Sequence, residues 1–175
     1  NIGIKRAKGQ YIFLPDADWV LTPYLLGECV SLMDRCDSVY IPEIIKTKGL
    51  FAKIRNWERQ FYTGTPIDVV RFVKTPCPLF DIEMTGPEDS DWDRRIKGKR
   101  LISKNPYYHY DNVSMIQWFS KKAYYSKSMD LFSQKNPNDK VLNLKWRCWT
   151  VFMEDSKWKL FLGHPLMAIC VITTL

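Results

Sequence analysis

The chain has 175 residues, 46% of them hydrophobic and 14% aromatic, which is enough to bury a core in one domain or slightly more. Its formal charge of +7 favours anionic partners such as nucleotide phosphates and acidic lipid headgroups. Nucleic-acid binding is not predicted, because neither zinc-finger spacing nor an RNP-like aromatic motif occurs. The five cysteines are odd in number and include no C-x-x-C, which argues against a disulfide framework or a zinc site. They favour reduced thiols in a cytosolic compartment.

The first residues predict the end of a helix over 2–8, closed by Gly9, and then a short buried strand over 10–14. The chain begins without an initiator Met or a secretory signal. We therefore expect that further N-terminal sequence of the same domain precedes it.

Two carboxylates, Asp16 and Asp18, follow this strand directly. Charge at the end of a buried strand is costly unless something compensates it. A hard divalent cation that also holds substrate phosphates is one compensation. The alternative is local: an Asp that begins a helix before Trp19, or an Asx turn. The pair by itself leaves both interpretations open.

Helices and short strands alternate along the next part of the chain. Pro23 opens a predicted helix over 24–35, a second predicted helix covers 48–62, and a third begins after the turn at Gly86 and ends at Gly98. The predicted strands are 38–42, 68–74 and 100–102. This alternation predicts an α/β domain.

A second acidic cluster stands at the start of the third helix, where Glu88, Asp89, Asp91 and Asp93 fall within six residues. Carboxylates in a first helical turn can simply stabilise the helix dipole. A carboxylate over a phosphate site can instead act as a general base toward an attacking hydroxyl. His109, one of two histidines, lies among aromatic residues and can equally be a packed residue or a ligand.

The composition changes at about residue 136. Lysines and an arginine alternate with tryptophans and phenylalanines over 140–162, a mixture typical of interfacial helices. Residues 165–175 are apolar but too few to span a bilayer. We expect 1–135 to be one unit and 136–175 a basic aromatic amphipathic tail leading into a membrane segment. The alternative is a C-terminal helix that packs on the domain.

The order of the motifs resembles the family 2 glycosyltransferases over residues 1–127. The motifs that carry the resemblance are 7–18, ending in Asp-Ala-Asp; Ile-Pro-Glu at 41–43; Arg-Phe-Val-Lys at 71–74; Phe-Asp at 80–81; Gly-Pro-Glu-Asp-Ser-Asp-Trp at 86–92; and the isolated His109. These enzymes use nucleotide-sugar donors and have the A-type fold. The resemblance therefore implies a Rossmann-like mixed sheet with helices on both faces, here without the N-terminal half of the domain.

The resemblance also implies roles for individual residues. Asp16 and Asp18 would hold Mn²⁺ or Mg²⁺ on the donor diphosphate, and His109 would be a third metal ligand. Asp89 would be the general base that deprotonates the acceptor hydroxyl for in-line attack, usually with inversion. The remaining assignments are Glu88, which would orient the acceptor, and Trp92 and Asp91, which would lie on the acceptor side.

Three departures from the family pattern qualify this prediction. The N-terminal units that carry most nucleoside-binding residues are not in the sequence, Pro78-Leu79 replaces a glycine pair, and the Q-x-x-R-W motif of processive synthases is missing. We predict a non-processive transferase at the cytoplasmic face of the cell membrane, with a UDP- or GDP-sugar donor and a glycan or lipid-linked acceptor. The alternatives are a nucleotidyltransferase with the same acidic metal site, or a non-catalytic membrane-binding module on a degenerate enzyme scaffold.

Overall fold

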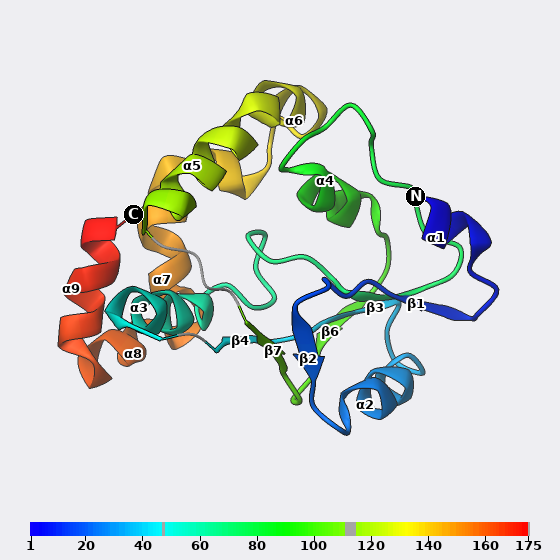
Figure 1. Cartoon of the computed structure of the whole chain (residues 1–175), viewed down its shortest axis with the longest axis horizontal. Coiled ribbons are helices and arrows are strands. Elements are labelled where there is room, and N and C mark those ends of the chain that lie inside the picture. The colour runs from blue at the N-terminus through cyan, green and yellow to red at the C-terminus, as the bar shows by residue number, and fades with distance from the viewer. Residues whose placement is uncertain (47, 111–114, 175) are drawn as a thin grey trace.

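The computed structural model describes residues 1–46, 48–110 and 115–174, which form two small sheets with helices around them (Figure 1). The strands are β1 (Tyr11–Phe13), β2 (Trp19–Leu21), β3 (Ser38–Tyr40), β4 (Glu43–Ile45), β5 (Phe72–Lys74), β6 (Arg100–Ile102) and β7 (Tyr107–His109). The α-helices are α1 (Ile2–Arg6), α2 (Leu25–Leu32), α3 (Leu50–Arg59), α4 (Glu88–Arg95), α5 (Met115–Tyr125), α6 (Met129–Lys135), α7 (Val151–Met153), α8 (Trp158–Gly163) and α9 (Pro165–Thr174).

Both sheets mix parallel and antiparallel pairs. The larger sheet has the strand order β1-β5-β3-β6, in which only the β3–β6 pair is parallel. The smaller sheet has the order β2-β7-β4, with β2–β7 antiparallel and β4–β7 parallel. Strand β7 is therefore central, and its side chains lie within reach of residues on β2 and β4. These mixed sheets confirm the predicted α/β class.

Helices cover the larger sheet on both faces. Val39 and Phe72 join a buried cluster with α2, whereas the next residues along each strand, Tyr40 and Val73, join a cluster with α4. Because successive side chains of a strand point to opposite faces, α2 and α4 lie on opposite sides of this sheet. Figure 1 shows α4 above the strands and α2 below them. The predicted arrangement of helices on both faces is confirmed.

Strands β2, β4 and β7, which together form the smaller sheet, were not predicted. Strand β2 begins at Trp19, so the alternative in which an Asp opens a helix there is wrong. The strand expected over 68–74 is limited to β5, and the helix expected over 24–35 ends at Leu32. Strand β6 has the predicted limits.

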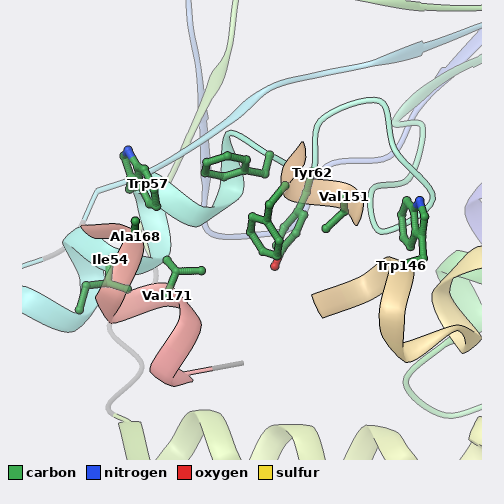
Figure 2. Close-up of a cluster of buried hydrophobic side chains, with 9 residues drawn as sticks. Ile54, Trp57, Tyr62, Trp146, Val151, Ala168 and Val171 are labelled. Carbon is green, nitrogen blue, oxygen red and sulfur yellow. The ribbon is translucent and has the colours of Figure 1, made fainter. Parts of the chain in front are cut away.

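The C-terminal segments pack against α3. In Figure 2, Ile54 and Trp57 of α3 lie beside Ala168 and Val171 of α9, and these side chains belong to one buried cluster. The cluster also takes in Phe61, Tyr62, Trp146, Val151 and Phe152. Packing of a C-terminal helix on the domain was the alternative that the sequence left open.

No helix in the described ranges is both long and apolar enough to cross a bilayer. The expected membrane segment is therefore not supported, and residue 175, the last of the predicted apolar run, lies outside those ranges. The division of the chain at residues 135 and 136 stays a prediction.

Candidate active site

A cavity of about 300 Å³, here called the site cavity, lies between the two acidic motifs. Its wall contains Asp16, Asp89 and His109, which come from three separate parts of the sequence. Two arginines also line it: Arg59, the last residue of α3, and Arg71, which directly precedes β5. The fold therefore places members of all three predicted motifs around one space.

His109 on β7 is held between two carboxylates. The β2–β7 register pairs His109 with Trp19, and the preceding Asp18 places its Oδ2 3.0 Å from His109 Nε2. On the other side, Glu43 of β4 places its Oε1 2.5 Å from His109 Nδ1. Glu43 is in turn paired with Arg59. One imidazole nitrogen is thus oriented by Glu43, and the other faces Asp18.

The charged groups that contact one another through Arg59, Glu43 and His109 stabilise each other. Burial opposes ionisation of Glu43, but its hydrogen bond to His109 and the charge of Arg59 outweigh burial and lower its pKa to about 2. The hydrogen bond to Glu43 raises the pKa of His109 above its ordinary value, against the effect of burial. The site cavity therefore has a fixed carboxylate behind the histidine.

Arg71 connects the two acidic motifs. Its carbonyl accepts a hydrogen bond from the Leu14 N–H at 2.9 Å, which places Arg71 beside the end of β1. Its Nη2 lies 4.0 Å from Asp16 Oδ2 and 3.6 Å from Asp89 Oδ2. Its guanidinium carbon lies 5.1 Å from the centroid of the Trp19 ring. A single cation therefore holds a carboxylate of each motif at the same cavity.

Asp89 lies in the first turn of α4 with its side chain 39% exposed. Desolvation raises the pKa of Asp89, although the charge of Arg71 acts in the opposite direction. A raised carboxyl pKa suits a general base, because proton transfer is most efficient when the pKa approaches the working pH. The Glu88 carboxylate turns back and accepts a hydrogen bond from the Gly86 N–H, and its role in orienting the acceptor stays a prediction.

Gly86 allows α5 to approach the loop that carries Asp89. Its φ is +105°, a left-handed value that favours glycine. A Cβ at this position would lie 2.6 Å from the Cα of Tyr125 in α5. A larger residue would therefore force α5 away from the acidic loop.

The structure does not bring Trp92 and Asp91 to the site cavity. Trp92 is 1% exposed, stacks on Phe80, and donates its indole N–H to the Pro78 carbonyl at 2.7 Å. Asp91 is buried and accepts a hydrogen bond from Arg95 at 2.9 Å. Both side chains are buried, and they follow Asp89 by two and three residues along α4. Their expected place on the acceptor side is corrected to the interior of the domain.

The predicted metal ligands are only partly gathered. Asp18 and His109 meet, whereas Asp16 contacts Arg71. In the part of the chain that the structure describes, no three His, Cys, Asp or Glu side chains converge to hold a metal ion by themselves. The Asp18–His109 pair still fits, because an imidazole backed by a carboxylate is a common metal ligand. Mn²⁺ or Mg²⁺ can complete such a two-ligand site with substrate phosphates and water. The ligand roles stay a prediction.

Asp68 is a buried carboxyl behind the cavity, and it provides a test of the local electrostatics. It accepts hydrogen bonds from the N–H groups of Val69 at 2.9 Å and Gly64 at 3.3 Å. Burial raises its pKa from 3.8 to about 6, against the charge of Arg59. The folded protein therefore retains this proton while the unfolded chain releases it, so the stability from this group declines as the pH rises from 4 to 6.

We expect Asp68→Asn to remove this decline. Between pH 4 and pH 7, the free energy of unfolding of the wild type should fall by about 2–3 kcal/mol more than that of the variant. Urea unfolding at several pH values measures the difference. Parallel pH profiles for the two proteins would show that Asp68 titrates at its ordinary pKa in the folded state.

The chain that carries this site is similar to a known protein family. The family model described as glycosyl transferase family 2 matches residues 1–124, well over half of the chain. The chain belongs to this family. No curated protein and no solved structure matches it.

As a family 2 glycosyltransferase domain, the chain has the expected A-type architecture, with mixed sheets and helices on both faces. Family 2 enzymes commonly use divalent metals and act on nucleotide-sugar donors. The match includes both acidic motifs and His109, and it ends within α5.

Three residues of this family 2 site were not assigned a role from the sequence. Glu43 and Arg71 stand inside motifs that carried the resemblance, and both line the cavity: Glu43 is the first residue of β4, and Arg71 directly precedes β5. Arg59 gave no sequence signal, because only the folding of α3 beside β4 brings it to Glu43.

Proposed function

We propose that this chain catalyses metal-dependent transfer of a hexose from a UDP- or GDP-sugar to a glycan or lipid-linked acceptor, with inversion. The observation that carries the proposal is the position of Arg71, which holds Asp16 and Asp89 at one cavity beside the Asp18–His109 pair. This arrangement provides a base for the acceptor and a polar environment for the donor diphosphate in the same space.

In the proposed reaction, Asp89 accepts the proton of an acceptor hydroxyl. The hydroxyl oxygen forms a bond to the anomeric carbon while the bond from that carbon to the diphosphate oxygen breaks. Arg71 orients the Asp89 carboxylate at 3.6 Å, and Arg59 on the cavity wall can stabilise the departing nucleoside diphosphate. When bound by Asp18 and His109, with Asp16 nearby, Mn²⁺ or Mg²⁺ would neutralise part of the diphosphate charge.

The reaction class is tested with the full-length protein and Mn²⁺ in two parallel reactions, one with a panel of UDP- and GDP-sugars and one with nucleoside triphosphates and sugar phosphates. Sugar transfer releases a nucleoside diphosphate. A nucleotidyltransferase would instead release pyrophosphate from a nucleoside triphosphate. Detection of pyrophosphate release, without nucleoside diphosphate release from any sugar donor, would replace this proposal with the nucleotidyl one.

We also propose that the protein contacts an anionic membrane surface at the cytoplasmic face. The support is a set of exposed apolar side chains on α8 and α9, the two helices at the lower left of Figure 1: Trp158 (44% exposed), Leu162 (74%) and Leu166 (77%). Lys159, in α8, is also exposed. Aromatic and apolar groups with nearby cations favour the headgroup region of anionic lipid.

We expect the full-length protein to sediment with phosphatidylserine-containing vesicles, and Leu162→Glu to reduce the bound fraction several-fold. Ile82→Glu is the matched control, because Ile82 is 87% exposed and lies near α4 rather than α8 or α9. Equal vesicle binding by both variants and the wild type would contradict a contact through α8 and α9.

A further inference from the structure

A second cavity of about 500 Å³ adjoins the site cavity. Four of its lining residues, Arg55, Trp118, Lys121 and Tyr125, also line the site cavity, so the two spaces meet along a shared wall between α3 and α5. We call this second space the basic cavity. It lies on the side of α5 that faces α6 and the loop before α4.

Positive charge is concentrated in the basic cavity. Arg55, Lys121, Lys122 and Arg147 line it, and no Asp or Glu is among its lining residues. Arg55 is offset by its salt bridge to Glu58. Among the described residues, no carboxylate forms a salt bridge with the other three cations. Partial desolvation and the charges of Arg147 and Arg55 lower the pKa of Lys122 to about 8. Glu58 acts on Lys122 as well but is paired with Arg55, so an anionic ligand can supply the salt-bridge partner that Lys121, Lys122 and Arg147 lack.

The cations are held next to an apolar surface. Two of them contact the Trp118 ring. The ring centroid is 5.2 Å from the Arg55 guanidinium carbon and 4.9 Å from Lys122 Nζ. The other wall contains Ile67, Met129, Phe132 and Val141. A ligand that fits this wall carries an anionic group together with an apolar portion.

The basic cavity also borders the proposed base. Gly86, Pro87 and Ser90 line it, and these residues flank Asp89, which lines the site cavity. A ligand bound in the basic cavity can therefore extend toward Asp89, which lines the adjoining site cavity. His109 lines the site cavity but not the basic cavity. This position is suitable for the acceptor, because its hydroxyl must meet Asp89 while the donor diphosphate lies near Asp18.

We propose that the basic cavity binds a phosphate group carried by the acceptor substrate. The proposal rests on the function proposed above and narrows the acceptor to a phosphate ester. The phosphate would be held by Lys121, Lys122 and Arg147 through charge-assisted hydrogen bonds. The remainder of the acceptor would extend along the apolar wall.

The binding test uses calorimetry of the full-length protein in EDTA without any nucleotide, so that donor binding and activity play no part. The probes are octyl phosphate, glucose 1-phosphate and the uncharged octyl glucoside. We expect octyl phosphate to bind at least ~10-fold more tightly than octyl glucoside, since loss of a charge-assisted contact is costly. Tighter binding of octyl phosphate than of glucose 1-phosphate identifies an amphiphilic phosphate. Equal binding identifies a water-soluble one.

Variants locate the phosphate. We expect Arg147→Gln and Lys122→Gln each to weaken octyl phosphate binding at least ~10-fold. Lys97→Gln, which makes the same charge change on an exposed residue beyond the opposite end of α4, should bind like the wild type. Unfolding temperatures measured for each variant verify that the fold is intact.

Two results would overturn the inference: equal affinity for octyl phosphate and octyl glucoside, or unchanged affinity in both cavity variants. Loss of octyl phosphate binding in Arg71→Gln would also overturn it, because Arg71 lines the site cavity and not the basic cavity, and the phosphate would then occupy the donor side. Failure of the proposed function is seen separately, as absence of nucleoside diphosphate release in a protein that still binds octyl phosphate with this selectivity.

Discussion

Asp89→Asn is expected to reduce sugar transfer at least ~100-fold while donor binding stays intact. The amide is nearly isosteric with the carboxylate but cannot accept the acceptor proton, so only the transfer step loses its base. Asp89 contacts Arg71 at 3.6 Å, and that cation also lies beside Asp16. Transfer rates at saturating donor, together with the donor Kd from calorimetry, separate the two effects.

Asp34→Asn is the matched control, because Asp34 is exposed in the turn after α2 and far along the chain from both acidic motifs. It should transfer sugar at the wild-type rate. Near-normal turnover of Asp89→Asn would remove Asp89 from the base role. A parallel loss of donor affinity would instead place Asp89 in donor binding.

Asp18→Ala is expected to abolish the Mn²⁺-dependent part of nucleoside diphosphate binding. Asp18 Oδ2 lies 3.0 Å from His109 Nε2, and removing the carboxylate leaves the imidazole as the single member of that pair. Calorimetric titration of the full-length protein with UDP and GDP, with and without Mn²⁺, measures the effect. The affinity of the variant in Mn²⁺ should equal its affinity in EDTA.

His109→Gln should behave in the same direction, because it removes the other half of the pair, whereas Asp34→Ala should retain the wild-type response to Mn²⁺. If Mn²⁺ strengthens UDP or GDP binding equally in Asp18→Ala and in the wild type, the metal assignment is wrong. Unchanged unfolding temperatures would exclude misfolding as the cause of a lost response.

The sequence predicted the parts of the fold that have a repeating pattern. The amphipathic helix expected over 48–62 contains α3, and the apolar strand expected over 10–14 contains β1. Strands β2, β4 and β7 were missed, and these three strands pair with one another in the smaller sheet. The sequence left two possibilities open for the tail, a membrane segment or packing on the domain, and the fold packs Trp146, Phe152 and Val171 in one cluster with residues of α3.

The sequence also identified Asp16, Asp18, Asp89 and His109 as members of one site, and the fold brings them to one region. It could not distinguish which acids of the second cluster face the cavity. Asp89 and Trp92 are three residues apart, yet one lines the cavity and the other is buried under Phe80. Only the packing of α4 on the sheet decides between them. The role of Arg71 likewise depends on the pairing of β1 with β5.

The most direct test of the central claim counts two products in one reaction of the full-length protein with a radiolabelled nucleotide sugar. The account predicts one nucleoside diphosphate released for each sugar transferred to the acceptor, with both products reduced at least ~100-fold in Asp89→Asn. Equal product formation by wild type and Asp89→Asn, or nucleoside diphosphate release without sugar transfer to the acceptor, would contradict it.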